Sequence, residues 1–268
     1  MVSIAVFGVG GRMGAALLKA ISNYKNLKLV AAVEQPGHPL TGLDSGSAAG
    51  CPPNGIKITD DSAAAVEAAD VVIDFTFHSV VPEIAGLVAK YKKAYILGTT
   101  GLTAEELAAV DDAAKVVPVM MAPNMSVGVN LLLDLVKQAA AVLTAGAGYD
   151  AEIVEMHHRH KRDAPSGTAL ALAKAVAAGR GIEFEDVALF GREGITGERE
   201  ADTIAVHAVR GGDVVGDHTV VFAADGERIE LVHKASGRGC FANGALRAAE
   251  WIVSKEPGYH QMRDVLGL

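Results

Sequence analysis

The sequence is short of the features that define several classes of protein. Its only cysteines, Cys51 and Cys240, lie far apart in 268 residues, so no disulfide framework is expected. No stretch approaches the ~20 consecutive apolar residues that a membrane-spanning helix needs. The first residues run into an apolar segment without the basic region or cleavage site of a signal peptide. We therefore expect a cytoplasmic protein that does not bind membranes.

An excess of positive charge is also absent. The formal net charge is −8 at pH 7, which disfavours general binding to nucleic acid because phosphate contacts need a basic surface. Aromatic residues make up only 5% of the chain, whereas hydrophobic residues make up 50%, and Ala, Val and Gly dominate. This composition is typical of α/β proteins, and the length allows one large domain or two modest ones.

The first half of the chain alternates between short apolar strands and helical patterns. This alternation predicts parallel βαβ units and hence a Rossmann-type, doubly wound parallel sheet. The expected strands are residues 3–7, 27–33, 71–75, 94–97 and 116–121, and the expected helices are residues 12–21, 62–69, 81–90 and 103–113.

The pattern changes after Asn124. A long apolar helix is expected at residues 131–143, a strand at 151–156, a helix at 168–178, and extended segments at 203–210, 218–223 and 228–232. These features predict a second, α+β domain with a mixed or antiparallel sheet that has one open face. The Ala-rich helix at residues 241–253 could pack back on the first domain. We therefore expect a dinucleotide-binding domain at 1–126 and 237–268, and a substrate-binding and oligomerisation domain at 127–236.

A glycine-rich turn, Gly8 to Gly14, follows the first strand and opens the first helix. Glycines let the backbone turn tightly and approach a pyrophosphate, which the helix N-terminus then stabilises. The match to G-x-G-x-x-G is imperfect, because Met13 occupies the third glycine position. Glu34 ends the second strand, where an acid can bind ribose hydroxyls. Together these features favour dinucleotide binding over an ordinary glycine turn with a solvated acid.

The segment from His157 to Arg162 places six residues that can carry positive charge in a row. Crowded cations favour an anionic ligand. If the segment starts extended, His157, Arg159 and Lys161 share one side of the chain. Ser166 then reads as a helix cap, with Gly167 and Thr168 at the helix start, so the region suits a carboxylate or phosphate.

Two other interpretations of this segment stay open. It could be a solvated basic loop, or its three histidines could bind a metal, although the neighbouring cations and the lack of a familiar ligand spacing disfavour a metal site. Histidine also suits proton transfer near neutral pH, and a reductase that takes hydride from a nicotinamide still needs a positioned proton donor.

The residues 157–169, HHRHKRDAPSGTA, resemble the signature of the dihydrodipicolinate (4-hydroxy-tetrahydrodipicolinate) reductase family. The resemblance also covers the glycine turn, Asp74 to Thr76, Gly98 to Gly101, Asn124 to Asn130 and Arg238 to Arg247, and so runs through nearly the whole chain. It implies a homotetramer that reduces dihydrodipicolinate to tetrahydrodipicolinate in diaminopimelate and lysine biosynthesis, with two domains joined by hinges.

The resemblance also implies roles for individual residues. His157 would donate or accept a proton and Lys161 would donate one, while His158, Gly167 and Thr168 would hold the carboxylates of a small dicarboxylate substrate. No metal is implied. The residues that would contact NAD(P)H are Gly8, Val9, Gly10, Gly11, Arg12, Met13, Glu34, Gly98, Thr99, Thr100, Ala122, Pro123, Asn124 and Met125.

One residue departs from the family pattern. Many members place Arg directly after the acid that ends the second strand, where it can receive the 2′-phosphate of NADPH, but this chain has Gln35. We therefore expect a modest preference for NADH, with NADPH still accepted. Two alternative functions remain: another dehydrogenase on the same fold, which the cationic segment disfavours, and a catalytically silent nucleotide sensor, which would not need both His157 and Lys161.

Overall fold

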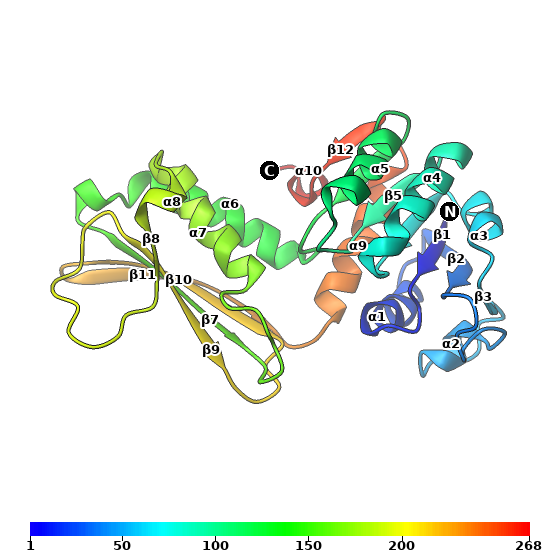
Figure 1. Ribbon diagram of the computed structural model, residues 1–268, viewed down its shortest axis with the longest axis horizontal. Helices are drawn as coiled ribbons and strands as arrows, with labels where there is room; N and C mark the ends of the chain where they lie inside the picture. Colours follow the sequence, from blue (N-terminus) through cyan, green and yellow to red (C-terminus); the bar gives the residue numbers. More distant parts are fainter. The chain divides into compact units, whose positions relative to one another are not determined.

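The computed structural model describes all residues from 1 to 268 and divides into two compact units, which we describe separately (Figure 1). Unit 1 contains Met1–Val127 and Arg238–Leu268, and unit 2 contains Gly128–Gly237. The boundaries expected from the sequence each lie one residue earlier. Unit 1 is therefore discontinuous in sequence, and unit 2 is continuous.

Unit 1 is built on a seven-stranded sheet in the order β12-β6-β5-β4-β1-β2-β3, and all neighbouring strands are parallel. The central strands are fully buried, as expected when helices cover both faces of a parallel sheet. This confirms the doubly wound parallel fold. The strands are β1 (Val2–Phe7), β2 (Leu27–Val33), β3 (Ile58–Thr59), β4 (Val71–Asp74), β5 (Ala94–Leu97), β6 (Pro118–Met121) and β12 (Gly258–His260).

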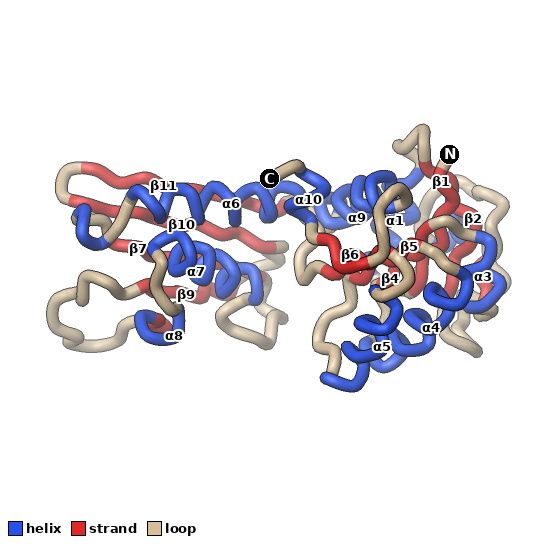
Figure 2. Tube along the Cα trace, turned by 90° about the horizontal axis from the view of Figure 1, so that it is seen from above, coloured by secondary structure: helices blue, strands red, loops and turns tan.

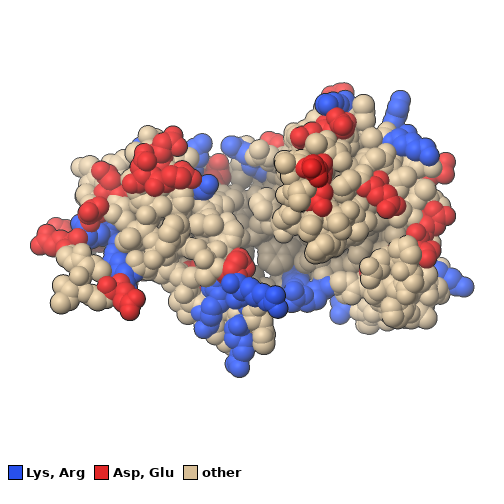
Figure 3. Space-filling model, in the orientation of Figure 1, with Lys and Arg blue, Asp and Glu red and all other residues tan.

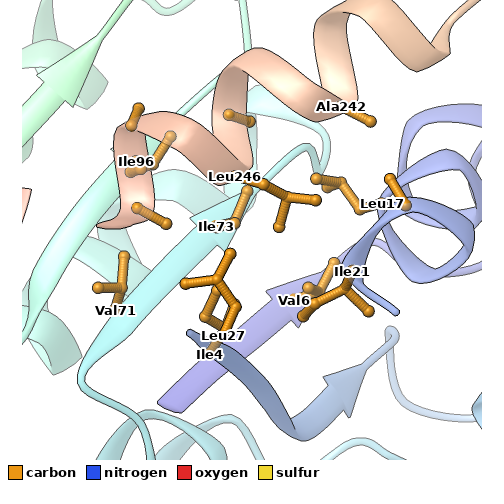
Figure 4. Close-up of a cluster of buried hydrophobic side chains, with 14 of the residues drawn as sticks. Ile4, Val6, Leu17, Ile21, Leu27, Val71, Ile73, Ile96, Ala242 and Leu246 are labelled. Atoms are coloured by element: carbon orange, nitrogen blue, oxygen red, sulfur yellow. The ribbon is translucent and has the colours of Figure 1, made fainter. Parts of the chain in front are cut away.

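Two helices far apart in sequence, α1 (Arg12–Ile21) and α9 (Gly239–Ile252), cover one face of this sheet. Figure 4 shows Val6 and Ile73 of the sheet facing Leu17 of α1 and Leu246 of α9. Figure 2 shows the opposite face covered by α3 (Ser62–Ala68), α4 (Val81–Tyr91) and α5 (Ala104–Ala114). The short helices α2 (Ser45–Ala48) and α10 (Met262–Leu266) complete the unit.

Unit 2 is built on a five-stranded sheet in the order β11-β10-β7-β9-β8. The β7–β9 and β9–β8 pairs are parallel and the other two are antiparallel, which confirms the mixed sheet. The strands are β7 (Asp150–His157), β8 (Ala188–Phe190), β9 (Ile204–Arg210), β10 (Gly216–Ala224) and β11 (Glu227–Ala235).

The helices of unit 2 pack on one face of its sheet only (Figure 1). They are α6 (Val127–Val142), whose first residue belongs to unit 1, α7 (Gly167–Arg180) and α8 (Phe184–Val187). On the uncovered face Val154, Val209 and Val232 remain 39%, 43% and 48% exposed. Alternation along the strands thus buries one face and leaves the other open.

Several boundaries differ from the sequence-based expectation for local reasons. β6 begins at Pro118 rather than at residue 116, because the N–H groups of Val116 and Val117 still donate to the carbonyl of Ala113 at the end of α5. α6 begins at Val127, one turn before residue 131. The strands β3, β8 and β12 were not expected, since each has only two or three residues. None of the helices combines the length and apolar content that crossing a bilayer requires.

Candidate active site

The glycine turn at the end of β1 is held by close backbone contacts. Gly8 has φ +78°, a conformation that favours glycine, and a Cβ added there would lie 2.8 Å from the carbonyl oxygen of Phe75. A Cβ on Gly14 would lie 2.3 Å from the carbonyl oxygen of Gly8. Gly11 caps α1 and donates its N–H to the same carbonyl at 3.1 Å. The glycines that make close contacts are therefore Gly8, Gly11 and Gly14, which are spaced three residues apart. Gly14 takes the role of the third glycine, so Met13 at the expected position does not break the motif.

Glu34 lies beside this turn. One carboxylate oxygen accepts the N–H of Gly10 at 2.8 Å, and the other accepts the N–H of Gln35 at 3.0 Å. A Cβ on Gly10 would meet both the Glu34 carboxylate, at 2.9 Å, and the His38 ring, at 2.8 Å. Gln35 is exposed. His38 therefore also borders the turn; sequence reasoning missed it because it lies in an irregular loop.

A cavity of about 320 Å³ within unit 1 collects most of the residues expected at the strand ends. Val9 and Thr99, by contrast, are buried, and the Thr99 hydroxyl donates to the carbonyl of Thr76 at 3.2 Å. Neither residue lines the cavity. The cavity is lined by Met13, Phe75, Gly98, Thr100, Ala122, Pro123, Asn124, Met125, Arg238 and Phe241.

Two glycines shape this cavity through close contacts. A Cβ on Gly98 would lie 2.1 Å from the Phe75 ring, and a Cβ on Gly244 of α9 would lie 1.7 Å from the carbonyl oxygen of Met125. Gly244 therefore needs to be glycine, because the group it meets is backbone, whereas a side chain at Gly98 would require the Phe75 ring to move. Gly244 lets α9 approach the Ala122–Met125 segment directly.

A buried carboxylate supports the loop that carries Phe75. Asp74 is fully buried and accepts hydrogen bonds from the Tyr95 hydroxyl at 2.5 Å and from the N–H of Thr76 at 2.8 Å. Burial raises the pKa of Asp74, and these hydrogen bonds oppose that effect. Sequence reasoning noted Asp74 as part of the resemblance but did not anticipate its pairing with Tyr95.

Arg238 also lines the cavity; the resemblance covers this residue but gave it no role in binding. Burial, together with the nearby charge of Arg12, lowers the pKa of Arg238. Two guanidinium groups placed close enough to repel each other favour an anion between or beside them. Arg12 is one of the residues expected to contact the cofactor, so Arg238 is a second cation close to that residue.

In unit 2, the cationic segment turns where β7 ends. Lys161 donates its N–H to the carbonyl of His158 at 3.1 Å, so the strand alternation stops at His157. The segment is therefore not extended beyond His157, and the condition under which His157, Arg159 and Lys161 would share one side of the chain is not met. Figure 3 shows Lys and Arg side chains gathered over the ends of β7 and β9, where the cationic segment begins. The Lys161 ammonium lies 2.9 Å from the Asp163 carboxylate.

His157 is almost completely buried at the end of β7. Its Nδ1 lies 2.6 Å from a carboxylate oxygen of Glu155, and its ring meets the ring of His218 edge-on at a centroid distance of 5.1 Å. Burial, followed by the adjacent His157, lowers the pKa of His218 to about 4. His218 is therefore neutral near pH 7, and two rings in contact need not both carry charge.

The start of α7 lies beside this pair of histidines. Ser166 caps the helix as expected, because its hydroxyl accepts the N–H of Ala169 at 3.1 Å. The same hydroxyl lies 3.2 Å from Nε2 of His218. Gly167 is exposed and Thr168 is half-buried at the first two helical positions. The structure thus brings His157, Ser166 and the N-terminus of α7 together.

Sequence reasoning missed three residues of this cluster: Glu155, Arg210 and His218. Glu155 lies two residues before His157, so strand alternation puts both on the same face and gave a usable signal. His218 and Arg210 come from distant strands and carried no comparable signal. No group of three or more His, Cys, Asp or Glu side chains is placed to hold a metal ion.

Comparison with known proteins accounts for both units. The family model described as dihydrodipicolinate reductase, N-terminus, matches residues 2–125, and the one described as dihydrodipicolinate reductase, C-terminus, matches residues 128–266. The 4-hydroxy-tetrahydrodipicolinate reductase of Thiobacillus denitrificans is 51% identical over 267 residues, covering 100% of this chain and 99% of that protein. The one from Anaeromyxobacter sp. is 50% identical over 268 residues, covering 100% and 98%.

Solved structures agree with the sequence comparison. A dipicolinate-bound dihydrodipicolinate reductase from Paenisporosarcina sp. TG-14 superimposes with a TM-score of 0.75 at 26% identity, covering 97% of each chain. A diaminopimelate dehydrogenase from C. glutamicum shares the fold alone, with a TM-score of 0.56 at 13% identity and coverage of 97% and 92%. By sequence over its full length and by fold, the chain belongs to the dihydrodipicolinate reductase family.

Proposed function

We propose that the chain reduces dihydrodipicolinate, formed from 4-hydroxy-tetrahydrodipicolinate, to tetrahydrodipicolinate in diaminopimelate and lysine biosynthesis, with NADH or NADPH as reductant. The observation that carries this proposal is the cluster in unit 2, where His157 and the N-terminus of α7 lie together in a segment that matches the family signature. A proton-transfer group beside a carboxylate-binding helix start suits the reduction of a cyclic dicarboxylate.

Unit 1 fits a dinucleotide. The contacts at Gly8 and Gly14 bring bare backbone to the start of α1, where a pyrophosphate binds. Glu34 stands at the end of β2, where ribose hydroxyls can donate to a carboxylate. The cavity lined by Gly98, Thr100 and residues 122–125 would hold a further part of the cofactor. When bound, the reduced nicotinamide supplies the hydride.

The residues of unit 2 would then manage binding and protons. Gly167, Thr168 and His158 would hold the substrate carboxylates, since the first turn of a helix offers N–H groups ahead of any intrahelical carbonyl. Lys161 would donate the proton that follows hydride transfer. His157 would donate or accept a proton through Nε2, because its Nδ1 faces Glu155.

The proposal includes self-association into a homotetramer. It is supported by the uncovered sheet face of unit 2, where Val154, Val209 and Val232 stay about half-exposed. Light scattering coupled to size-exclusion chromatography measures the mass directly. A monomer at micromolar concentration would contradict the proposed homotetramer but would leave the proposed reaction unaffected.

The catalytic assignment is tested with freshly generated substrate and NADH. His157→Ala and Lys161→Ala should each lower kcat by roughly 10²–10⁴, the usual range for a lost proton-transfer group, with little change in NADH affinity. His160→Ala and Arg162→Ala are matched controls, because both side chains are exposed in the same segment. Near-normal turnover in the first pair would contradict the assignment. Turnover of an aldehyde panel instead of the dicarboxylate would favour another dehydrogenase.

A further inference from the structure

The Glu155 carboxylate is saturated with donors from three elements. It has no exposed surface. One oxygen lies 2.6 Å from Nδ1 of His157 and accepts from Arg210 at 2.8 Å. The other accepts the N–H of Ser166 at 3.0 Å and the second Arg210 nitrogen at 2.9 Å. All four acceptor positions of the carboxylate are therefore occupied.

These contacts keep Glu155 ionised although it is buried. Burial opposes ionisation, but the bonds from Arg210, His157 and Ser166 outweigh it and hold the pKa of Glu155 below its usual value. Arg210 also donates to the carbonyl of Asp163 at 2.7 Å, so it joins the carboxylate to the loop that carries Lys161. A carboxylate held in this way can only accept hydrogen bonds.

An acceptor at Nδ1 fixes the form of the His157 ring. Nδ1 must carry the hydrogen, so in the neutral ring Nε2 carries the lone pair. On the Nε2 side the chain has Gly216, where an added Cβ would lie 3.0 Å from Nε2. Glycine at this position therefore keeps a side chain off the nitrogen that would exchange a proton.

The second oxygen connects this arrangement to the helix that would hold substrate. The N–H that it accepts belongs to Ser166, the residue that caps α7. One carboxylate thus fixes both the His157 ring and the first residue of the cap before Gly167 and Thr168. Displacing the carboxylate would release both at once.

We infer that Glu155 is a positioning residue, which holds His157 as the Nδ1–H tautomer and sets it in register with the N-terminus of α7. The inference rests on the proposed function, because it assigns proton transfer to His157. The plain alternative is a buried ion pair between Glu155 and Arg210 that only joins β7 to β9. The two differ in what happens to the His157 ring.

The first measurement uses the unmodified protein. In ¹⁵N-histidine NMR of the full chain, with the His157 signal assigned through His157→Gln, we expect hydrogen on Nδ1 at pH 8. Hydrogen on Nε2 in place of Nδ1 would overturn the inference. This readout does not depend on turnover, so it still reports on Glu155 if the proposed reaction fails.

The second measurement uses Glu155→Gln, which keeps the size but removes the charge and replaces one accepting oxygen with a donor. We expect loss of the pure Nδ1–H signal, a fall in kcat of about 10- to 100-fold, and a KM for NADH within twofold of wild type. A fall in kcat with an unchanged tautomer would indicate the structural alternative and overturn the inference, as would unchanged kcat.

Glu152→Gln is a matched control. Glu152 lies on the same strand and opposite face, where it pairs with Arg192, Arg199 and His207. This substitution disrupts a similar ionic cluster but leaves the contacts of His157 intact, so the Nδ1–H tautomer should persist. If light scattering shows that the variant has the same mass as wild type, kcat should stay within twofold of wild type. If wild type reduces no dicarboxylate while Nδ1–H is found, the proposed function fails and the positioning of His157 stands.

Discussion

His218 makes the stability of the protein depend on pH. Its pKa is lowered to about 4 in the folded chain, against an ordinary value near 6.5, so the unfolded chain binds the proton more readily. The stability that this neutral ring contributes is present above pH 6.5 and is lost as the pH falls toward 4. The shift corresponds to a loss on the order of 3 kcal/mol.

Urea unfolding at pH 7.5, 6, 5 and 4 measures this effect. We expect His218→Gln to show a flatter fall in unfolding free energy than wild type between pH 6.5 and 4. His160→Gln, at an exposed position, should follow wild type. Parallel curves for wild type and His218→Gln would show that His218 is not the group responsible. The pKa of Glu152 is lowered to about 2, so the stability that its ionised form contributes is lost only at pH values below its ordinary pKa near 4.5.

Residue 35 should set the choice of cofactor. Glu34 uses both oxygens on the N–H groups of Gly10 and Gln35, yet its negative charge would still repel a 2′-phosphate, and Gln35 supplies no compensating charge. A charge-assisted hydrogen bond contributes about 1.5–3 kcal/mol, or roughly ten- to a hundredfold in affinity. We expect wild type to prefer NADH modestly and Gln35→Arg to shift kcat/KM toward NADPH.

The cofactor measurement needs a control for general effects of charge. Gln261→Arg adds the same charge at an exposed position in unit 1, before α10, and should leave the NADH to NADPH ratio unchanged. Arg12→Ala should weaken NADPH more than NADH. Wild type that binds NADPH at least tenfold tighter than NADH at physiological salt would contradict the prediction.

At the level of elements, the contact between α9 and the Ala122–Met125 segment should not tolerate a methyl group. Because a Cβ on Gly244 would lie 1.7 Å from the Met125 carbonyl oxygen, Gly244→Ala must push the helix and the cavity wall apart. We expect a loss of about 1–3 kcal/mol in stability and a clear weakening of NADH binding, measured by calorimetry and fluorescence titration. Gly86→Ala in α4, with open space around it, should instead leave binding unchanged and stabilise slightly.

The elements show which features the sequence could predict. Apolar periodicity located α1, β2 and β5 at their observed bounds, because each is a regular run with clear ends. It did not predict β12, whose three residues add to the sheet edge beside β6 only through tertiary pairing. Ser166 was predicted as a cap from its local pattern, whereas the contacts of Glu155 with Arg210 join strands 55 residues apart and left no local trace.

For the whole molecule, two units with separate hydrophobic cores should unfold in two steps. Two core clusters belong to unit 1 and a third to unit 2. In differential scanning calorimetry we expect NADH at 100 times its Kd to stabilise unit 1 by about 2.7 kcal/mol, or roughly 5–10 °C. Under the proposed function, a pyridine dicarboxylate analogue of the substrate should move the transition of unit 2. If calorimetry shows one transition, and each ligand raises the temperature of that same transition, the two units unfold together and the prediction is wrong.

The discontinuity of unit 1 has a consequence for how the chain is made. During synthesis, residues 1–127 leave the ribosome long before α9, so the sheet face with Ile4, Val6 and Ile73 has α1 but lacks its second covering helix. Unit 2 must be translated in between, which takes roughly 5–20 s at ordinary elongation rates. Unit 2, continuous in sequence, can therefore fold first. Residues 1–127 meanwhile expose an apolar surface, which is a site for chaperone binding or aggregation until Gly239–Ile252 emerges.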